Sequence, residues 1–387
     1  MPKYSLRFLA VLAISIFFLA CPLLPVQAAN IETTAESAIL LEAKTGKVIM
    51  EKDPHKELPP ASVTKLMTLL VAVEAVETGK VKLDDTVIAS EKASSLGGSQ
   101  IYLEPGEKFS LEEMLIAIAV GSANDACVAV AEHICGTHEE FVDLMNQKAK
   151  QLGLKNTNFV NSYGLPAEGH YTSAYDMSVI GREALKYPLI TKLCAIKEYD
   201  LRGGDFKLWN TNKLLWWYEG TDGFKTGWTQ EANYCLASTV ERDGLRLICV
   251  VMGVPEVRGH FRESMKIYNY GFAKYAYKEL APAGSKQGEV KVDKGSKLRV
   301  DLIAEKPIGA CVEKGSKEEL RVETIVDFQV RAPVLKGQKL GEVIVYSGQT
   351  ELERVNLIAK EEIEKASLAE MIKRTVKEAY QMTEFAF

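Results

Sequence analysis

The sequence predicts an α+β fold in which an antiparallel sheet is flanked by helices. Apolar and β-branched residues around turn-forming residues indicate two hairpins, Ala38–Lys52 and Tyr234–Val254. Between them, from Val81 to about Asp200, the spacing of apolar residues is mostly helical and predicts an inserted helical lobe. After the Pro- and Gly-containing segment 281–285, short alternating segments run to about residue 360 and predict a small all-β domain.

A helix that carries the first candidate site follows the first hairpin. Pro59-Pro60 marks its entry, apolar residues at helical spacing run from Val63 to Glu77, and Gly79 is placed to stop it. Ser62 then lies in the first turn, with Lys65 one turn later on the same face at the positive end of the helix dipole. A hydroxyl beside an amine in this position suits a serine nucleophile with lysine as its proton acceptor.

Two further polar motifs belong to the same predicted domain. Two helical patterns, 111–120 and 125–134, leave Ser122-Ala123-Asn124 in the short turn between them, from which side chains can point into a cleft. Lys225-Thr226-Gly227 leads into the second hairpin, where a strand edge can hold a substrate strand and Gly227 allows a close approach. A helical pattern over Arg258–Leu280 completes the domain.

The N-terminal residues predict an export signal. Two basic residues precede an apolar run, Phe8–Cys21, and small residues at Val26-Gln27-Ala28 offer a cleavage site. An apolar helix of about fourteen residues spans roughly 21 Å, short of a bilayer core of about 30 Å, which favours a cleaved signal over an uncleaved anchor. Lipidation at Cys21 is the other alternative, although Phe18 fits a lipoprotein cleavage site poorly. We expect the protein to work outside the cytoplasmic membrane.

These patterns divide the chain into four parts. They are an export signal (1–29), a catalytic domain (30–280), a β domain (286–360) and a final amphipathic helix (361–387). In the final part, Ile363 and other apolar residues lie near one predicted helical face, with charges of both signs elsewhere. Such a helix can lie on a membrane surface, and packing on the domain or on a partner is the alternative.

The composition argues against several classes of function. A formal charge of −5, a pI of about 5.8 and the absence of a long basic run disfavour nucleic acid as a partner. The histidines form no His-Glu-x-x-His pattern and the cysteines lack metal-ligand spacing, so we expect no metal and no cofactor. Six cysteines follow the signal, and we expect free, mostly buried thiols at positions 127, 135, 194, 235, 249 and 311.

The three motifs together are stronger evidence for a catalytic site than any one of them alone. Ser62-x-x-Lys65 and Ser122-x-Asn124, taken singly, are more often helix caps or capping turns than catalytic groups. With Lys225-Thr226-Gly227 following them in order, they form the set described for penicillin-binding proteins and class A β-lactamases. The set predicts acyl transfer by an activated serine.

The chain resembles the serine-type D-alanyl-D-alanine carboxypeptidases, the low-molecular-mass penicillin-binding proteins of peptidase family S11, in particular those of sporulating Gram-positive bacteria. Besides the motifs, the resemblance rests on Gly164-Leu165, Gly169–Ser173, Asp176-Met177 and Arg246–Gly253. It covers nearly the whole chain and implies a β-lactamase/transpeptidase-like domain followed by the family's C-terminal β-sandwich. It also implies that the final helix occupies the place of a membrane-surface anchor.

The resemblance implies that the substrates are peptidoglycan stem peptides ending in D-Ala-D-Ala and that β-lactam antibiotics are covalent inhibitors. Ser62 would attack the peptide and Lys65 would take its proton. A free lysine is neutral in only about one molecule in 2,500 at pH 7, and burial and a nearby second cation can each lower the pKa of Lys65. Lys225 is the natural second cation. The backbone N–H groups of Ser62 and Trp228, next to Gly227, would hold the oxyanion.

The remaining roles follow from the same resemblance. Ser122 would relay a proton to the leaving amine, Asn124 would position the peptide, and Thr226 and Arg262 would receive the terminal carboxylate. The chain departs from many members in having Trp228 after Lys-Thr-Gly, where they carry His or Tyr, and in having Thr211 where some relatives place an arginine. These departures bear on substrate preference.

Three alternatives use the same resemblance differently. A class A β-lactamase would carry a deacylating glutamate in a Glu-x-x-Leu-Asn run, and no such run lies between residues 125 and 224, so any β-lactamase activity should be weak. A D,D-endopeptidase uses the same chemistry and is separated only by substrate trials. A non-catalytic β-lactam or peptidoglycan sensor would acylate without turnover, although sensors normally carry a signalling or transmembrane segment.

Overall fold

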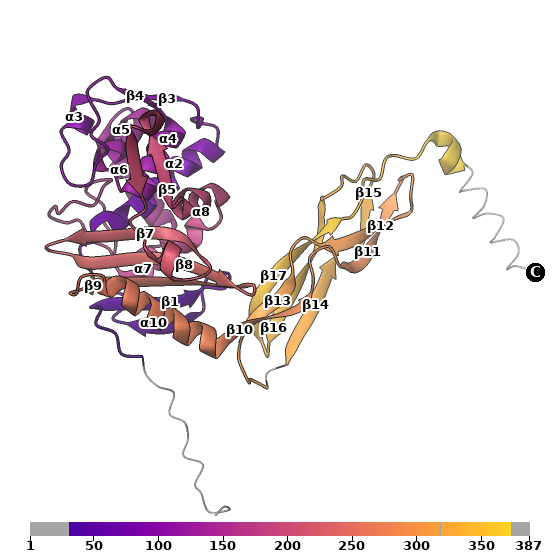
Figure 1. The fold of residues 1–387 in the computed structure, drawn as a ribbon. Coiled ribbons are helices and arrows are strands. Elements are labelled where there is room, and N and C mark those ends of the chain that lie inside the picture. The colour runs from indigo at the N-terminus through magenta and orange to yellow at the C-terminus, as the bar shows by residue number, and fades with distance from the viewer. Residues whose placement is uncertain (1–30, 318, 373–387) are drawn as a thin grey trace, which may run out of the picture. The chain divides into compact units, whose positions relative to one another are not determined.

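The catalytic domain is built on a five-stranded antiparallel sheet, here described from a computed structural model of residues 31–317 and 319–372 (Figure 1). The strand order is β2-β1-β9-β8-β7. The strands are β1 (Ser37–Glu42), β2 (Val48–Lys52), β7 (Thr221–Thr229), β8 (Asn233–Arg242) and β9 (Leu245–Val254). Both predicted hairpins are confirmed, and β1 pairs with β9, which brings the two ends of the domain together in one sheet.

Helices cover both faces of this sheet. Neighbouring residues of a strand point to opposite faces of the sheet, so the side chains of Leu247 and Ile248 in β9 lie on opposite faces. A Cβ added to Gly271 of α10 (Gly259–Lys274) would lie 2.8 Å from the Leu247 side chain. One added to Gly181 of α7 (Ala174–Ala184) would lie 3.5 Å from Ile248 on the other face. The sheet is therefore the middle layer of three (Figure 1).

The helical lobe is confirmed, and it contains short strands that the helical pattern did not predict. Within the predicted range its helices are α3 (Glu91–Ser94), α4 (Leu111–Ile116), α5 (Asn124–Cys135), α6 (His138–Gln151), α7 and α8 (Pro188–Ala195). In the chain, α2 (Lys65–Glu77) precedes this range and α9 (Leu214–Trp217) follows it. Two small hairpins join it, formed by β3 (Thr86–Ile88), β4 (Lys108–Ser110), β5 (Glu198–Leu201) and β6 (Phe206–Trp209). Strands of three or four residues are too short to show an alternating pattern.

The predicted nucleophile helix exists in two pieces. A 3-10 turn, η1 (Ala61–Thr64), precedes α2, and Gly79 follows its end with φ +73°. Instead of one apolar stripe, α2 is buried at almost every position from Lys65 to Ala75. The helix is thus a central element of the core, which fixes its first residue, Lys65, in space.

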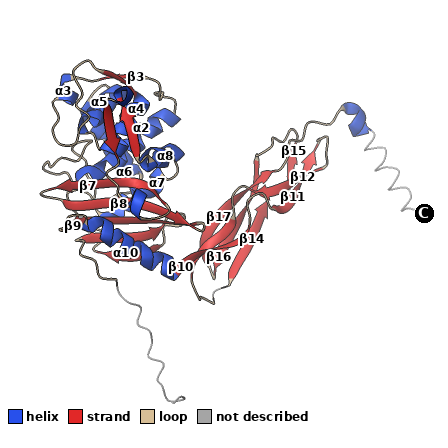
Figure 2. Ribbon diagram, in the orientation of Figure 1, coloured by secondary structure: helices blue, strands red, loops and turns tan. Residues whose placement is uncertain are grey.

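The β domain begins earlier than predicted. The helix expected to run to Leu280 ends at Lys274, because the next residues pair as a strand with β13. Figure 2 shows a domain of strands: β10 (Tyr275–Ala281), β11 (Lys286–Asp293), β12 (Arg299–Ala304), β13 (Ile308–Glu313), β14 (Leu320–Val326), β15 (Gln329–Arg331), β16 (Lys339–Ser347) and β17 (Thr350–Ala359). β10 and β13 form a two-stranded sheet, and a six-stranded sheet has the order β14-β16-β17-β12-β11-β15.

The predicted final helix is wrong for its first part. Ile363 pairs with Val334 in both directions through 2.9 Å backbone hydrogen bonds, and its side chain is fully buried in the β-domain core. Helix appears only from Leu368, and positions 373–387 lie outside the described residues. The apolar residue that helped to define an amphipathic face is thus used by the β domain. Among residues 31–317 and 319–372, no helix is long and apolar enough to cross a membrane.

All six cysteines expected to be free are free, and all but Cys135 are buried. The prediction of unpaired, mostly buried thiols is confirmed. Burial raises the pKa of five of these thiols (127, 194, 235, 249 and 311) to about 12, so they remain protonated near neutral pH.

Candidate active site

A cleft of about 350 Å³ brings the predicted motifs together. Ser62 from η1, Ser122 from the turn before α5, and Thr226, Gly227 and Trp228 from β7 all line it. Its other lining residues are Ser99, Thr211, Lys213, Tyr234, Arg258, His260 and Phe261. Motifs separated by up to about 160 positions in the sequence therefore meet on one surface.

The candidate nucleophile lies between the helix and the strand. Ser62 is partly exposed in η1, and Lys65, the first residue of α2, places its Nζ 2.8 Å from Ser62 Oγ. β7 approaches this turn closely: a Cβ on Gly227 would lie 3.0 Å from both the backbone N of Ser62 and the Cβ of Ala61. Glycine at position 227 therefore leaves space for the backbone of Ser62, the candidate nucleophile.

Lys65 has its three possible donors committed to three acceptors. Besides Ser62 Oγ, its Nζ lies 2.7 Å from Asn124 Oδ1 and 2.6 Å from the backbone oxygen of Tyr163. Exchanging the oxygen and nitrogen of the Asn124 amide would lose a hydrogen bond, because its Nδ2 donates to the Gly97 oxygen at 2.7 Å. When Lys65 is neutral, its two N–H groups satisfy Asn124 and Tyr163 and its lone pair faces Ser62 Oγ.

The environment also favours the neutral form of this lysine. Lys65 is fully buried, and burial lowers its pKa to about 8, against which the nearby Cys127 and Asp125 act in the opposite direction. With a pKa of about 8, roughly one molecule in ten carries neutral Lys65 at pH 7. Lys65 therefore has both the geometry and the acidity expected of a general base.

A second buried lysine lies behind the strand wall of the cleft. Lys225 has no exposed side-chain surface, and burial together with the charge of Lys65 lowers its pKa to about 7. Its Nζ donates to the Thr226 oxygen at 3.1 Å and approaches Thr211 Oγ1 at 3.4 Å. The charge of Lys65 thus acts on Lys225, whereas the lowered pKa of Lys65 itself is due to burial.

Ser122 is aimed by an irregular helix end. The chain leaves α4 through a π-helical turn, η2 (Ala117–Gly121), and Ser122 follows in the left-handed region with φ +60°. Asn124 then begins α5, and its backbone N–H donates to the Ser99 oxygen at 2.7 Å. The predicted turn between two helices is confirmed, and π-helical turns of this kind are frequent at functional sites.

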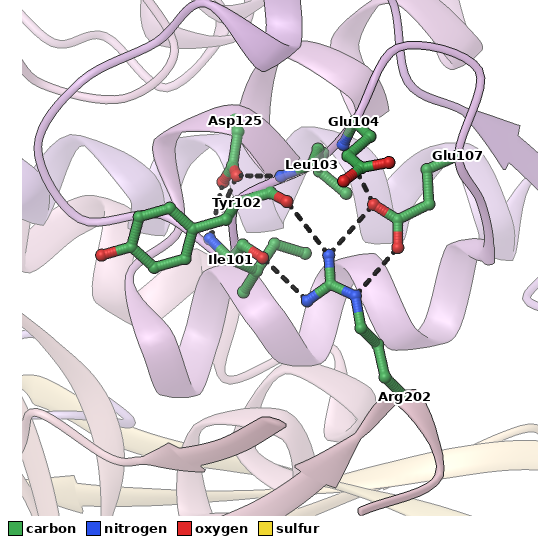
Figure 3. A network of polar contacts seen from close by, with 7 residues as sticks. All are labelled: Ile101, Tyr102, Leu103, Glu104, Glu107, Asp125 and Arg202. Atoms are coloured by element: carbon green, nitrogen blue, oxygen red, sulfur yellow. Dashed lines mark hydrogen bonds and ion pairs between the residues drawn. The ribbon is translucent and has the colours of Figure 1, made fainter. Parts of the chain in front are cut away.

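A polar network holds the loop that supports Asn124 (Figure 3). The buried carboxylate of Asp125 accepts hydrogen bonds from the backbone N–H groups of Ile101 and Leu103, at 3.0 Å and 3.1 Å. Arg202 reaches the same loop from the β5–β6 hairpin, donating to the Ile101 oxygen at 2.8 Å and pairing with Glu107 at 2.8 Å. That ion pair lowers the pKa of Glu107. Residues 101–107 of the loop are thus fixed from two sides, and Asn124 contacts the preceding residues Gly97 and Ser99.

The structure does not bring Arg262 into the cleft. Its guanidinium pairs with Glu256 at 2.6 Å, and more than half of its side chain is exposed. Arg258, four residues earlier and in the left-handed region at the start of α10, lines the cleft instead. Thr226 Oγ1 donates to Thr211 Oγ1 at 2.7 Å, and both residues line the cleft.

Three features of the site were missed by sequence reasoning. The Tyr163 oxygen is a backbone group, which no side-chain motif reports. The prediction named Arg262 instead of Arg258. The left-handed conformation of Arg258 leaves no signal in the sequence, because arginine rarely adopts it. The sequence did mark Thr211 as unusual, but its hydrogen bond to Thr226 appears only in three dimensions.

Residues 25–256 match the family described as D-alanyl-D-alanine carboxypeptidase, peptidase S11, and residues 275–365 match the penicillin-binding protein 5 C-terminal domain. The chain is 43% identical over 346 residues to D-alanyl-D-alanine carboxypeptidase DacF of Bacillus subtilis (strain 168), covering 88% of this chain and 89% of that one.

Solved structures agree with this assignment. The fold is similar to that of penicillin-binding protein 5 from Haemophilus influenzae, with a TM-score of 0.67 and 33% identity over 87% of this chain and 99% of that chain. It is also similar to ampicillin-bound penicillin-binding protein D2 from Listeria monocytogenes, with a TM-score of 0.58 and 29% identity over 63% and 99% of the two chains. This chain belongs to the D-alanyl-D-alanine carboxypeptidase family, the S11 serine peptidases.

Proposed function

We propose that this protein removes the terminal D-alanine from peptidoglycan stem pentapeptides through an acyl-enzyme on Ser62. The observation that carries the proposal is the contact between Lys65 Nζ and Ser62 Oγ at 2.8 Å, with the other donors of Lys65 committed elsewhere. This arrangement points a lone pair of neutral Lys65 at the hydroxyl. It is the geometry that general-base activation of a serine requires.

Acylation follows from this arrangement. Ser62 Oγ attacks the carbonyl carbon between the two D-alanines while Lys65 takes its proton. The backbone N–H groups of Ser62 and Trp228 stabilise the oxyanion that forms. The C–N bond then breaks, the proton held by Lys65 passes through Ser122 to the departing amine of D-alanine, and an ester remains on Ser62 with Lys65 neutral again. In the second half, Lys65 takes a proton from the water that attacks the ester, the Ser62 C–O bond breaks, and Lys65 returns this proton to Ser62 Oγ.

Two parts of the cleft position the substrate in this proposal. Asn124 holds the peptide on the helix side, next to the lysine whose geometry it fixes. Thr226 receives the terminal carboxylate on the strand side. We assign the accompanying arginine to Arg258 in place of Arg262, because Arg258 lines the cleft and Arg262 is paired with Glu256.

β-Lactams are proposed as covalent inhibitors of the same serine. Attack of Ser62 on the lactam opens the ring and leaves an ester, and the chain lacks the Glu-x-x-Leu-Asn run that would speed its hydrolysis. The predicted export signal puts this chemistry outside the cytoplasmic membrane, where peptidoglycan lies. Ile363 is buried in the β domain, so it is not available for the membrane contact expected of residues 361–387.

The test compares residues 30–387 with the Ser62→Ala variant, and uses Ser95→Ala, an exposed serine on the same lobe, as the matched control. D-alanine release from a stem peptide ending in D-Ala-D-Ala is measured beside labelling by a fluorescent penicillin. We expect both signals in wild type and in Ser95→Ala, and neither in Ser62→Ala. Labelling without release would indicate a sensor or a D,D-endopeptidase that needs a cross-linked substrate. Release that survives in Ser62→Ala would show that the nucleophile is another residue.

A further inference from the structure

The turn that presents Ser62 has an unfavourable backbone conformation. Ala61 lies in the left-handed region with φ +48°, which side chains with a Cβ rarely adopt. The residue is almost completely buried, and the next residue is the candidate nucleophile. Such a conformation persists only where surrounding contacts determine it, so the contacts of the Ala61 peptide group decide where Ser62 Oγ lies.

A chain of buried hydrogen bonds ends on the carbonyl of Ala61. The hydroxyl of Thr64 donates to the Ala61 oxygen at 2.8 Å, and His170 Nε2 lies 3.0 Å from the same hydroxyl. At the other side of the ring, the backbone N–H of Val160 donates to His170 Nδ1 at 2.9 Å. Thr64 is fully buried and His170 is 6% exposed, so water cannot readily replace these partners.

The direction of every proton in this chain is determined. A backbone N–H can only donate, so His170 Nδ1 must carry a lone pair, and a neutral imidazole then holds its proton on Nε2. His170 Nε2–H donates to Thr64 Oγ1, which leaves the proton of Thr64 for the Ala61 oxygen. A polar chain with one allowed direction is more restrictive than a set of independent contacts.

Gly164 packs closely against the same turn. A Cβ at this position would lie 1.9 Å from the Ala61 oxygen and 2.9 Å from Thr64 Oγ1. The preceding carbonyl, that of Tyr163, accepts from Lys65 Nζ at 2.6 Å. The segment from 160 to 170 therefore touches both partners of the catalytic pair, the base through Tyr163 and the nucleophile's turn through His170.

We propose that His170 is a positioning residue that acts through Thr64 on the Ala61 carbonyl and thereby sets Ser62 Oγ against Lys65 Nζ. The inference rests on the proposed function only in taking Ser62 as the nucleophile. The simple alternative is that His170 is a buried polar group whose hydrogen bonds contribute to stability alone.

Two substitutions at position 170 separate these roles, because each keeps one half of the imidazole's bonding. His170→Gln carries an amide near the place of Nε2 and can still donate to Thr64, but it loses the acceptor for Val160. His170→Asn keeps an acceptor near the place of Nδ1 for Val160, but it cannot reach Thr64. A purely stabilising histidine predicts similar losses for the two variants.

The measurement is the second-order rate constant of acylation by fluorescent penicillin, corrected for the folded fraction. We expect at least a tenfold loss in His170→Asn and in Thr64→Val, and no further loss in the double variant, because both changes break one chain. His170→Gln and Thr64→Ser should restore most of the rate. His133→Asn, a histidine on α5 that lies 3.6 Å from Asp85, is the matched control and should react at the wild-type rate.

Crystal structures of His170→Asn and Thr64→Val supply a readout that does not depend on activity. We expect Ala61 to leave the left-handed region and the Ser62 Oγ to Lys65 Nζ distance to exceed hydrogen-bonding range. An unchanged turn, equal rates in the Asn and Gln variants, or additive losses in the double variant would overturn the proposal. A wild-type protein that is not labelled at all would instead contradict the proposed function, and the crystal structures would still decide the role of His170.

Discussion

The helix side and the strand side of the cleft each contain a fully buried lysine, and the two are held differently. Lys65 has three acceptors within 2.8 Å of its Nζ, whereas Lys225 has a carbonyl at 3.1 Å and a hydroxyl at 3.4 Å. Burial lowers the pKa of both. Depressed pKa values do not by themselves define a base: the fixed geometry of Lys65 supports its proposed role as proton acceptor, and the longer contacts of Lys225 fit the proposed role of an electrostatic partner.

The largest effect should follow from removing the base. Lys65→Met keeps the length and burial of the side chain but removes the proton acceptor, so we expect acylation by fluorescent penicillin to fall by about a thousandfold. The second-order rate constant of labelling measures this. A loss of less than tenfold would mean that the proton goes elsewhere, and Lys225 would be the next candidate.

A smaller loss, with a diagnostic pH shift, should follow on the strand side. Lys225→Met should lower kcat/KM by about a hundredfold, since it removes one preorganised charge near the reacting groups. Because a neighbouring cation disfavours protonated Lys65, its removal should raise the pKa of Lys65. The acid limb of the kcat/KM profile should then move to higher pH. An acid limb that stays in place, or moves to lower pH, would show that the two lysines are not coupled.

The two arginines near the start of α10 offer a sharper test of the strand side. Arg258→Ala should raise the KM for a D-Ala-D-Ala peptide by about tenfold, because it removes a charge-assisted contact to the terminal carboxylate. Arg262→Ala should change KM by less than about twofold, since it breaks an exposed ion pair with Glu256. Steady-state kinetics on both variants measure the difference. The reverse ranking would restore Arg262 as the carboxylate ligand.

The next prediction concerns stability, not catalysis, and involves one histidine on each side. Burial lowers the pKa values of His170 and His260 to about 4, so the unfolded chain binds more protons than the folded one between about pH 6.5 and pH 4. Stability should therefore fall as pH drops through this window, by on the order of 3 kcal/mol for each histidine once pH 4 is reached.

His260 differs from His170 because it is held by ring stacking against Tyr234 and its Nδ1 has no hydrogen-bond partner among the described residues. His260→Phe should leave the free energy of unfolding at pH 7.5 within about 0.5 kcal/mol of wild type. Between pH 4 and pH 5 the variant should lose less stability than wild type does. Urea unfolding at several pH values measures both quantities. A variant that is strongly destabilised at pH 7.5 would show that the nitrogen has a partner in solution.

Side-chain chemistry made the core of this site predictable from sequence. Ser62, Lys65, Ser122 and Asn124 lie where helix starts and turns were expected, because short-range spacing determines their relation to one another. Lys225 joined them through the order of the motifs. The sheet was predictable for a similar reason, since hairpin patterns are local.

The rest depended on long-range contacts. Chain segments that meet only in the folded protein determine the contact of the Tyr163 carbonyl, the conformation of Arg258 and the hydrogen-bond chain from His170 through Thr64 to Ala61. The prediction of the final helix was wrong at Ile363 for the same reason. Ile363 fits a helical face in sequence, but a strand-like pairing with Val334 buries it. Periodicity reports that a residue is apolar and does not report which core receives it.

The π-helical turn before Ser122 bears on how this domain can change its length. An α-helix advances by about 100° per residue, so deleting one residue from Ala117–Gly121 would let the turn relax to α-helix and rotate the following backbone away from the cleft. Such a deletion would add no charge, remove no motif and leave every named side chain in the sequence. We therefore expect a one-residue deletion at this point to reduce activity as strongly as substitution of Ser122 itself.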